Sequence, residues 1–166
     1  MPTLIRAQNG RMVLANDAFT HVDDEQELPP GEVILSLARF QAEGDALLSQ
    51  GRAVGVRLNP DEEVEALAYD LPRLALVALS FPKFLDGRHY SNVQILRERY
   101  EFQREIRAVG DVLREQAYYM YRSGFDAFEP ADDSTPEQWE HAVRRFRHVY
   151  QRAVDGRVPA FAEREQ

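Results

Sequence analysis

The chain has 166 residues, of which 44% are hydrophobic and 29% are charged, a balance typical of one ordinary globular domain. It contains no cysteine, which excludes disulfides, cysteine nucleophiles and cysteine-ligated zinc or iron–sulfur clusters for this chain acting alone. The formal net charge of −8 argues against nonspecific binding to nucleic acid or to anionic membranes.

Two short apolar runs at the start, 4–7 and 12–14, flank Asn9-Gly10, a dipeptide suited to a tight hairpin turn. This pattern predicts an N-terminal β-hairpin. The acidic segment 20–30 has no apolar period and predicts a surface loop.

Residues 1–7 lack the apolar stretch of a signal peptide, and no run approaches the roughly 18 apolar residues of a membrane span. We therefore expect a cytoplasmic protein without a membrane partner.

From Val33 onward, apolar runs alternate with helical segments. Predicted strands cover 53–58, 74–79, 106–110 and 125–128, and predicted helices begin near Ser36, Asn59, Ser91, Asp111 and Thr135. This alternation predicts an α/β fold with a parallel sheet of about four βα units, either an open sheet or a half-barrel. The unbroken apolar run 74–79 is typical of a central strand covered on both faces.

The last predicted helix begins at Thr135-Pro136 and places Trp139, Val143, Phe146 and Tyr150 at helical spacing. The arginines that alternate with them, Arg144, Arg145, Arg147 and Arg152, are interpreted as the solvated face of that helix. We expect one domain over 1–166, made of a hairpin and acidic loop (1–32), a core (33–130) and a C-terminal helix and tail (131–166). The oligomeric state stays open.

In either architecture, ligands bind at the carboxyl ends of parallel strands, so we expect a binding site in the loops that follow the strands. The densest polar group lies in 81–91, where flexible Gly87 and two cations precede a predicted helix. One interpretation is a clamp for an anion or a carboxylate, and the alternative is a structural loop in which Asp86 pairs with Arg88. The candidate residues for binding an anion or a partner are Lys83, Asp86, Arg88, Tyr90, Ser91, Asp111, Gln116 and Arg57.

Other residues give weaker signals. His89 is interpreted as a surface residue, and the four histidines show no metal-ligand spacing, so no metal site is predicted. Tyr118, Tyr119 and Tyr121 lie on one predicted helix and cannot all face the protein core. They indicate a partner surface, a stacking site for a planar cofactor, or simply hydroxyls that reach water. No nucleotide or hydrolase motif is present, so neither a cofactor nor a catalytic residue is assigned.

Several blocks occur in a fixed order over roughly 33–128: Phe81-Pro82-Lys83-Phe84, Asp86-Gly87-Arg88, Tyr90-Ser91, Leu96-Arg97-Glu98-Arg99-Tyr100, Arg107-Ala108-Val109-Gly110-Asp111-Val112-Leu113-Arg114 and Gly124-Phe125-Asp126-Ala127-Phe128. With these blocks the chain resembles the bacterial family DUF934. The resemblance implies an oxidoreductase-associated role in sulfite reduction, because proteins of that family are described as oxidoreductases of this pathway. Their genes commonly neighbour the gene for the sulfite reductase haemoprotein.

A catalytic oxidoreductase needs a redox centre, and this sequence offers neither cysteine ligands nor a flavin or nicotinamide fingerprint. We therefore expect an accessory or binding role in assimilatory sulfite reduction, with the sulfite reductase haemoprotein or its electron donor as partner. An enzyme that uses a bound small molecule and a free-standing anion-binding module are the alternatives.

Overall fold

The computed structural model describes residues 2–164. Its centre is one eight-stranded sheet in the order β2-β1-β8-β7-β6-β5-β4-β3. The strands are β1 (Leu4–Gln8), β2 (Arg11–Ala15), β3 (Phe19–Val22), β4 (Glu32–Ser36), β5 (Val54–Leu58), β6 (Leu76–Phe81), β7 (Glu105–Gly110) and β8 (Ala127–Phe128). Strands β3 to β8 are parallel, whereas β1 pairs antiparallel with both β2 and β8. The α/β class is confirmed, but the sheet is mixed rather than purely parallel.

The predicted N-terminal hairpin is present as β1 and β2. Its turn residues Asn9 and Gly10 have φ angles of 51° and 76°, the left-handed values that this turn requires. The hairpin extends the main sheet, because β1 bonds to β8 at Ile5 and Arg6. This long-range pairing, which no local pattern indicates, makes the sheet mixed.

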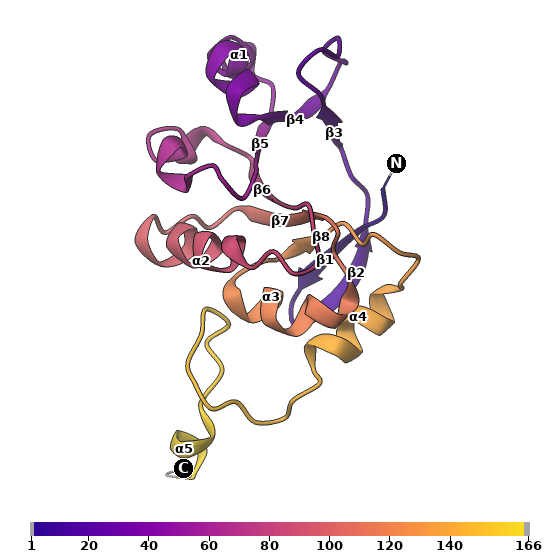
Figure 1. The fold of residues 1–166 in the computed structure, drawn as a ribbon, viewed down its shortest axis with the longest axis vertical. Coiled ribbons are helices and arrows are strands. Elements are labelled where there is room, and N and C mark those ends of the chain that lie inside the picture. The colour runs from indigo at the N-terminus through magenta and orange to yellow at the C-terminus, as the bar shows by residue number, and fades with distance from the viewer. Residues whose placement is uncertain (1, 165–166) are drawn as a thin grey trace.

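The helices are α1 (Leu37–Ser49), α2 (Arg88–Gln94), α3 (Ala117–Ser123), α4 (Pro136–Val143) and α5 (Ala160–Glu163). Helices α1, α2 and α3 connect successive parallel strands and lie along the same side of the sheet (Figure 1). Strand β5 is followed only by the 3₁₀ turns Val64–Leu67 and Leu71–Arg73, so a regular series of four βα units is not confirmed. No helix among the described residues has the length and apolar character needed to cross a bilayer.

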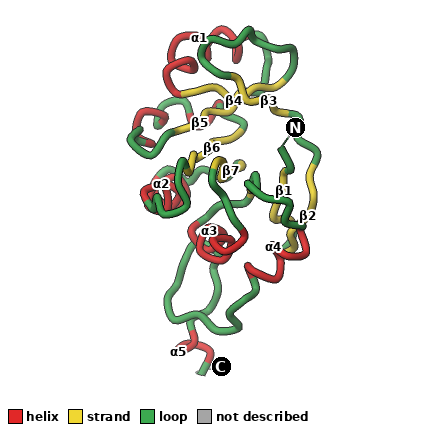
Figure 2. Tube along the Cα trace, turned by 45° about the vertical axis from the view of Figure 1, so that its right-hand side comes forward, coloured by secondary structure: helices red, strands yellow, loops and turns green. Residues whose placement is uncertain are grey.

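The sheet curls into a half-barrel, one of the two predicted forms (Figure 2). His21 on edge strand β3 lies 2.8 Å from the carboxylate of Glu129, which directly follows β8. In a flat sheet, five strand spacings would separate β3 and β8 by about 24 Å. The concave face carries a small apolar cluster of Ile34, Leu76, Ala78 and Val109, while the larger core lies under the helices.

Strand β6 is the predicted central strand, with parallel neighbours on both sides and every apolar side chain buried. The predicted start of α1 at Ser36 is also confirmed, because the Ser36 hydroxyl accepts a hydrogen bond from the Arg39 amide at 3.1 Å. The predicted start of α4 at Thr135 is confirmed as well, because Thr135 and Gln138 form a reciprocal capping pair there.

Several predicted element boundaries were wrong. Residues 20–22 of the predicted acidic loop belong to β3, where parallel pairing with β4 stabilises them. Helix α2 begins at Arg88, before Ser91, and Asn59 starts a turn rather than a helix. The last long helix ends at Val143, so residues 144–150 leave the helix and run below α3 toward α5 (Figure 1).

Candidate functional site

The loop 82–87 follows central strand β6 at the carboxyl edge of the sheet, where the sequence predicted a site. Two polar side chains from the next connection hold its backbone. The Asp111 carboxylate accepts a hydrogen bond from the Phe84 amide at 2.8 Å, and the Gln116 amide donates to the Phe84 carbonyl oxygen at 2.9 Å. Asp111 and Gln116 therefore hold both backbone polar groups of Phe84 and fix the loop. The helix predicted to begin near Asp111 starts only at Ala117, after the 3₁₀ turn Arg114–Gln116.

Strand β7 must come close to β6 for this contact to form. Gly110 has a φ angle of +97°, and a Cβ atom there would lie 2.4 Å from the carbonyl oxygen of Phe81. The next amide, that of Asp111, donates to this same oxygen at 2.6 Å. Only glycine fits here, and this position aims Asp111 at the loop.

Arg88 and Asp86 form a fork, with the Nε and Nη2 atoms of Arg88 at 3.1 and 2.7 Å from the two carboxylate oxygens. The hydrogen bonds from Arg88 lower the pKa of Asp86 to about 2. The pocket beside Arg88 is lined by Asp61, Glu62 and Glu63 among others. An anion at Arg88 would have to displace Asp86 and approach these carboxylates. The anion clamp stays a prediction, and its structural alternative is the arrangement present here.

The remaining candidates lie around this loop without converging on one point. Lys83 is exposed, and Ser91 lies within α2 rather than at its start. Tyr90 is half-buried with its ring 5.8 Å from that of Phe81, and burial raises its pKa to about 12. Arg57, on the concave face, lies 3.7 Å from Asp23, and among the described residues no ion pair joins it to the loop.

His89 was predicted at the surface, and this prediction is wrong. Its side chain is buried below the loop, with Nε2 3.2 Å from the Leu58 carbonyl oxygen and Nδ1 3.0 Å from the side-chain amide of Asn92. Burial lowers its pKa to about 4, so the ring is neutral near pH 7. The early start of α2 turns His89 inward, because it moves this residue from the loop onto the buried face of a helix.

Sequence reasoning missed a buried ionic cluster on the concave face. Arg107 is fully buried, at 2.7 Å from Asp17 and 2.8 Å from both Glu105 and Glu129. Burial opposes its charge, but the hydrogen bonds that Arg107 donates to Asp17 and the negative charges of the other carboxylates raise its pKa above the ordinary arginine value. One sequence pattern could have revealed this cluster. Glu105 and Arg107 alternate with apolar neighbours in a central strand, which places two charges on one buried face.

This cluster holds the two sides of the half-barrel together. Asp17 lies in the connection from β2 to β3, which crosses between opposite edges of the sheet, and Glu129 follows β8. Glu129 also accepts from His21 on β3, and Arg6 on β1 lies 2.6 Å from Glu105. Since its members pair with one another across the fold, we assign the cluster a structural role. Within residues 2–164, no group of three or more acidic or histidine side chains is arranged to hold a metal ion.

Comparison with known protein families matches residues 55–161 to the family described as "Bacterial protein of unknown function (DUF934)". No curated protein matches the chain. The matched range begins after α1 and includes the loop 82–87, α4 and most of the C-terminal segment. Because it covers more than half of the 166 residues, the chain belongs to the DUF934 family.

Proposed function

We propose that this protein is an accessory protein of assimilatory sulfite reduction that docks on the sulfite reductase haemoprotein through the loop 82–87. The pathway comes from the family resemblance. The docking role is supported by one structural observation: the loop exposes apolar side chains on a fixed backbone. Leu85 is 89% exposed and Phe84 is 38% exposed, although Asp111 and Gln116 hold the backbone N–H and C=O groups of Phe84.

A loop fixed in this way is suited to binding a protein surface. Its backbone is already ordered, so association costs less conformational entropy than for a mobile segment. The exposed Leu85 offers apolar area to bury, and the neighbouring Lys83 adds a positive charge in a protein of net charge −8. The loop lies within the range that matches the family, so the proposal applies to a shared part of the chain.

The proposal is tested by measuring the affinity of the purified protein for purified sulfite reductase haemoprotein, for example by biolayer interferometry. We expect Leu85→Asp to weaken binding at least about tenfold, equivalent to roughly 1.4 kcal/mol, because a carboxylate would be buried in the interface. The matched control is Leu14→Asp, since Leu14 is 67% exposed on the distant hairpin strand β2. Equal affinities for the parent and the Leu85 variant would refute the docking role of this loop.

The electron donor of the reductase is the second bait. If the protein binds the electron donor and not the haemoprotein, the donor is the partner and the proposed docking on the haemoprotein is wrong. In cells, a deletion strain should grow more slowly on sulfate than on cysteine, and Leu85→Asp should complement it less well than Leu14→Asp. Purified protein that reduces sulfite by itself with reduced nicotinamide would favour the enzyme alternative instead.

A further inference from the structure

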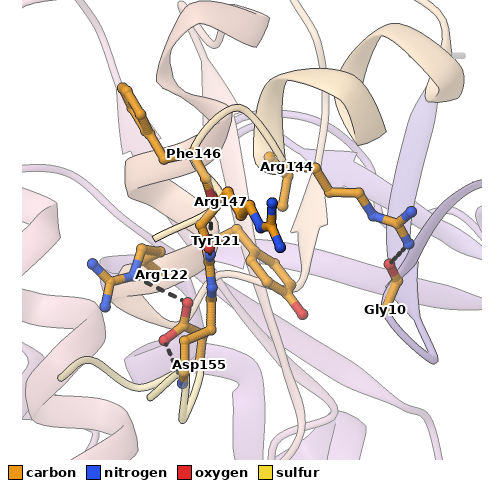
Figure 3. A pocket seen from close by; sticks show the side chains of 9 residues that line it. Gly10, Tyr121, Arg122, Arg144, Phe146, Arg147 and Asp155 are labelled. Carbon is orange, nitrogen blue, oxygen red and sulfur yellow. Dashed lines mark hydrogen bonds and ion pairs between the residues drawn. The ribbon is translucent and has the colours of Figure 1, made fainter. Parts of the chain in front are cut away.

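A cavity of about 380 Å³ lies where α3, the end of α4 and the C-terminal segment meet (Figure 3). Four of its lining residues are arginines: Arg122 from α3, and Arg144, Arg147 and Arg157 from the segment that leaves α4. We call this the arginine pocket. It lies below the sheet, on different elements from the loop 82–87. Of its arginines, only Arg144 and Arg147 belong to the run that was interpreted from the sequence as the solvated face of the last helix.

The arginine pocket is a local exception in a protein of net charge −8. Its one lining carboxylate is Asp155, whose side chain is only 2% exposed and lies 3.0 Å from Arg122. Asp155 also accepts from the Arg157 amide at 3.2 Å, so both of its oxygens are occupied. Four arginines thus line one cavity. Arg122 pairs with Asp155 and Arg144 pairs with Glu140, which leaves Arg147 and Arg157 without a carboxylate partner among residues 2–164. Repulsion among these cations favours occupation of the pocket by an anion.

The arginines differ in how much structure depends on them. Arg144 lies 3.2 Å from Glu140 and donates to the Gly10 carbonyl oxygen at 3.0 Å. Arg157 donates to the carbonyl oxygens of residues 146 and 147, which fixes the segment. Within residues 2–164, no carboxylate pairs with Arg147, and Figure 3 shows its side chain beside that of Tyr121. Arg147 is therefore the arginine whose charge is available to a ligand.

A second cavity of about 320 Å³ adjoins the arginine pocket and shares Arg122 and Phe146 with it. Aromatic rings dominate its wall: Tyr118, Tyr119 and Tyr150 join Phe146 there. The ring of Tyr118 lies 5.1 Å from that of Tyr119 and 4.8 Å from that of Phe146. Tyr119 is 59% exposed and Tyr150 is 85% exposed, so their rings are free to cover a ligand. We call this the aromatic pocket.

We infer that the two pockets together form a site for a nucleotide, with the phosphate in the arginine pocket and the base in the aromatic pocket. Guanidinium groups match phosphate oxygens with two parallel hydrogen bonds. Tyrosine and phenylalanine rings stack on bases, with a contribution of about 1–3 kcal/mol per base. Each cavity has the size of an ordinary small-ligand pocket. The shared residues Arg122 and Phe146 place a cation and a ring where the two halves of one ligand would join.

The test is isothermal titration of the purified full chain with adenosine 5′-monophosphate, adenosine and inorganic phosphate at low ionic strength. We expect the monophosphate to bind at least about tenfold more tightly than either fragment, because it occupies both pockets. Phosphate that binds as tightly as the monophosphate would refute the role of the aromatic pocket. The absence of any binding at millimolar monophosphate would overturn the inference.

Three variants assign the contacts. Arg147→Ala should weaken the monophosphate and phosphate by at least tenfold each, and it leaves no buried carboxylate without a partner. Tyr150→Ala should weaken the monophosphate and adenosine but leave the affinity for phosphate unchanged. Arg99→Ala is the control, because Arg99 is 66% exposed, lies beside Glu65 and carries the same charge. Equal losses for Arg147→Ala and Arg99→Ala would exclude the arginine pocket. Both arginine variants should still bind the haemoprotein, which separates this inference from the proposed function.

Discussion

At the residue scale, His89 couples the stability of the fold to pH. Its pKa is about 4 when folded and about 6.5 when unfolded, so the unfolded state binds the proton first as the pH falls. The stability that neutral His89 provides is complete above pH 6.5 and is lost as the pH falls toward 4. We expect the free energy of unfolding to decrease by roughly 3 kcal/mol over this window, measured by urea denaturation at several pH values.

The control for this prediction is His89→Gln, which removes the titrating group but keeps an amide donor for the Leu58 carbonyl oxygen. The variant should be less stable than the parent at pH 7, with a smaller loss of stability between pH 6.5 and 4. Equal slopes in the two proteins would show that other groups cause the pH dependence.

At the element scale, the contact between β6 and β7 depends on Gly110. Gly110→Ala would push a methyl group against the Phe81 carbonyl oxygen in a backbone conformation that disfavours side chains. We expect a loss of about 1–3 kcal/mol in the free energy of unfolding, measured by urea denaturation. Gly87→Ala is the comparison, since φ is −95° there and the nearest atom, in the Tyr90 ring, lies 4.0 Å from the new Cβ. A loss at Gly110 no larger than at Gly87 would contradict the close-approach explanation.

At the scale of the whole molecule, the buried Arg107 cluster stabilises the curl of the half-barrel. Arg107→Met would leave Asp17 buried without a cation and would take one partner each from Glu105 and Glu129, which keep Arg6 and His21. The expected cost is about 3–5 kcal/mol of unfolding free energy, a large share of the total for a domain of this size. Thermal and urea denaturation would measure it. Arg99→Met, at an exposed ion pair, should change stability by less than about 1 kcal/mol. Similar losses for the two variants would rule out a special role for the cluster.

Much of the fold could be predicted from the sequence, but little of the site geometry. The hairpin at Asn9-Gly10, the start of α1 at Ser36 and the start of α4 at Thr135 were all predicted correctly. The loop after β6 was singled out, with an anion clamp and a structural loop as alternative interpretations. In the structure Asp111 and Gln116 hold the loop by Phe84, and Arg88 pairs with Asp86.

The sequence by itself determined the features whose energy comes from neighbouring residues: turns, helix caps and the apolar run of β6. These depend on hydrogen bonds and periodicities that span a few positions. Only the tertiary structure decided the pairing of β1 with β8, the burial of Arg107 and the gathering of four arginines around one cavity. Such contacts join residues far apart in the chain, and they form because burying the whole core offsets the entropy of closing long loops.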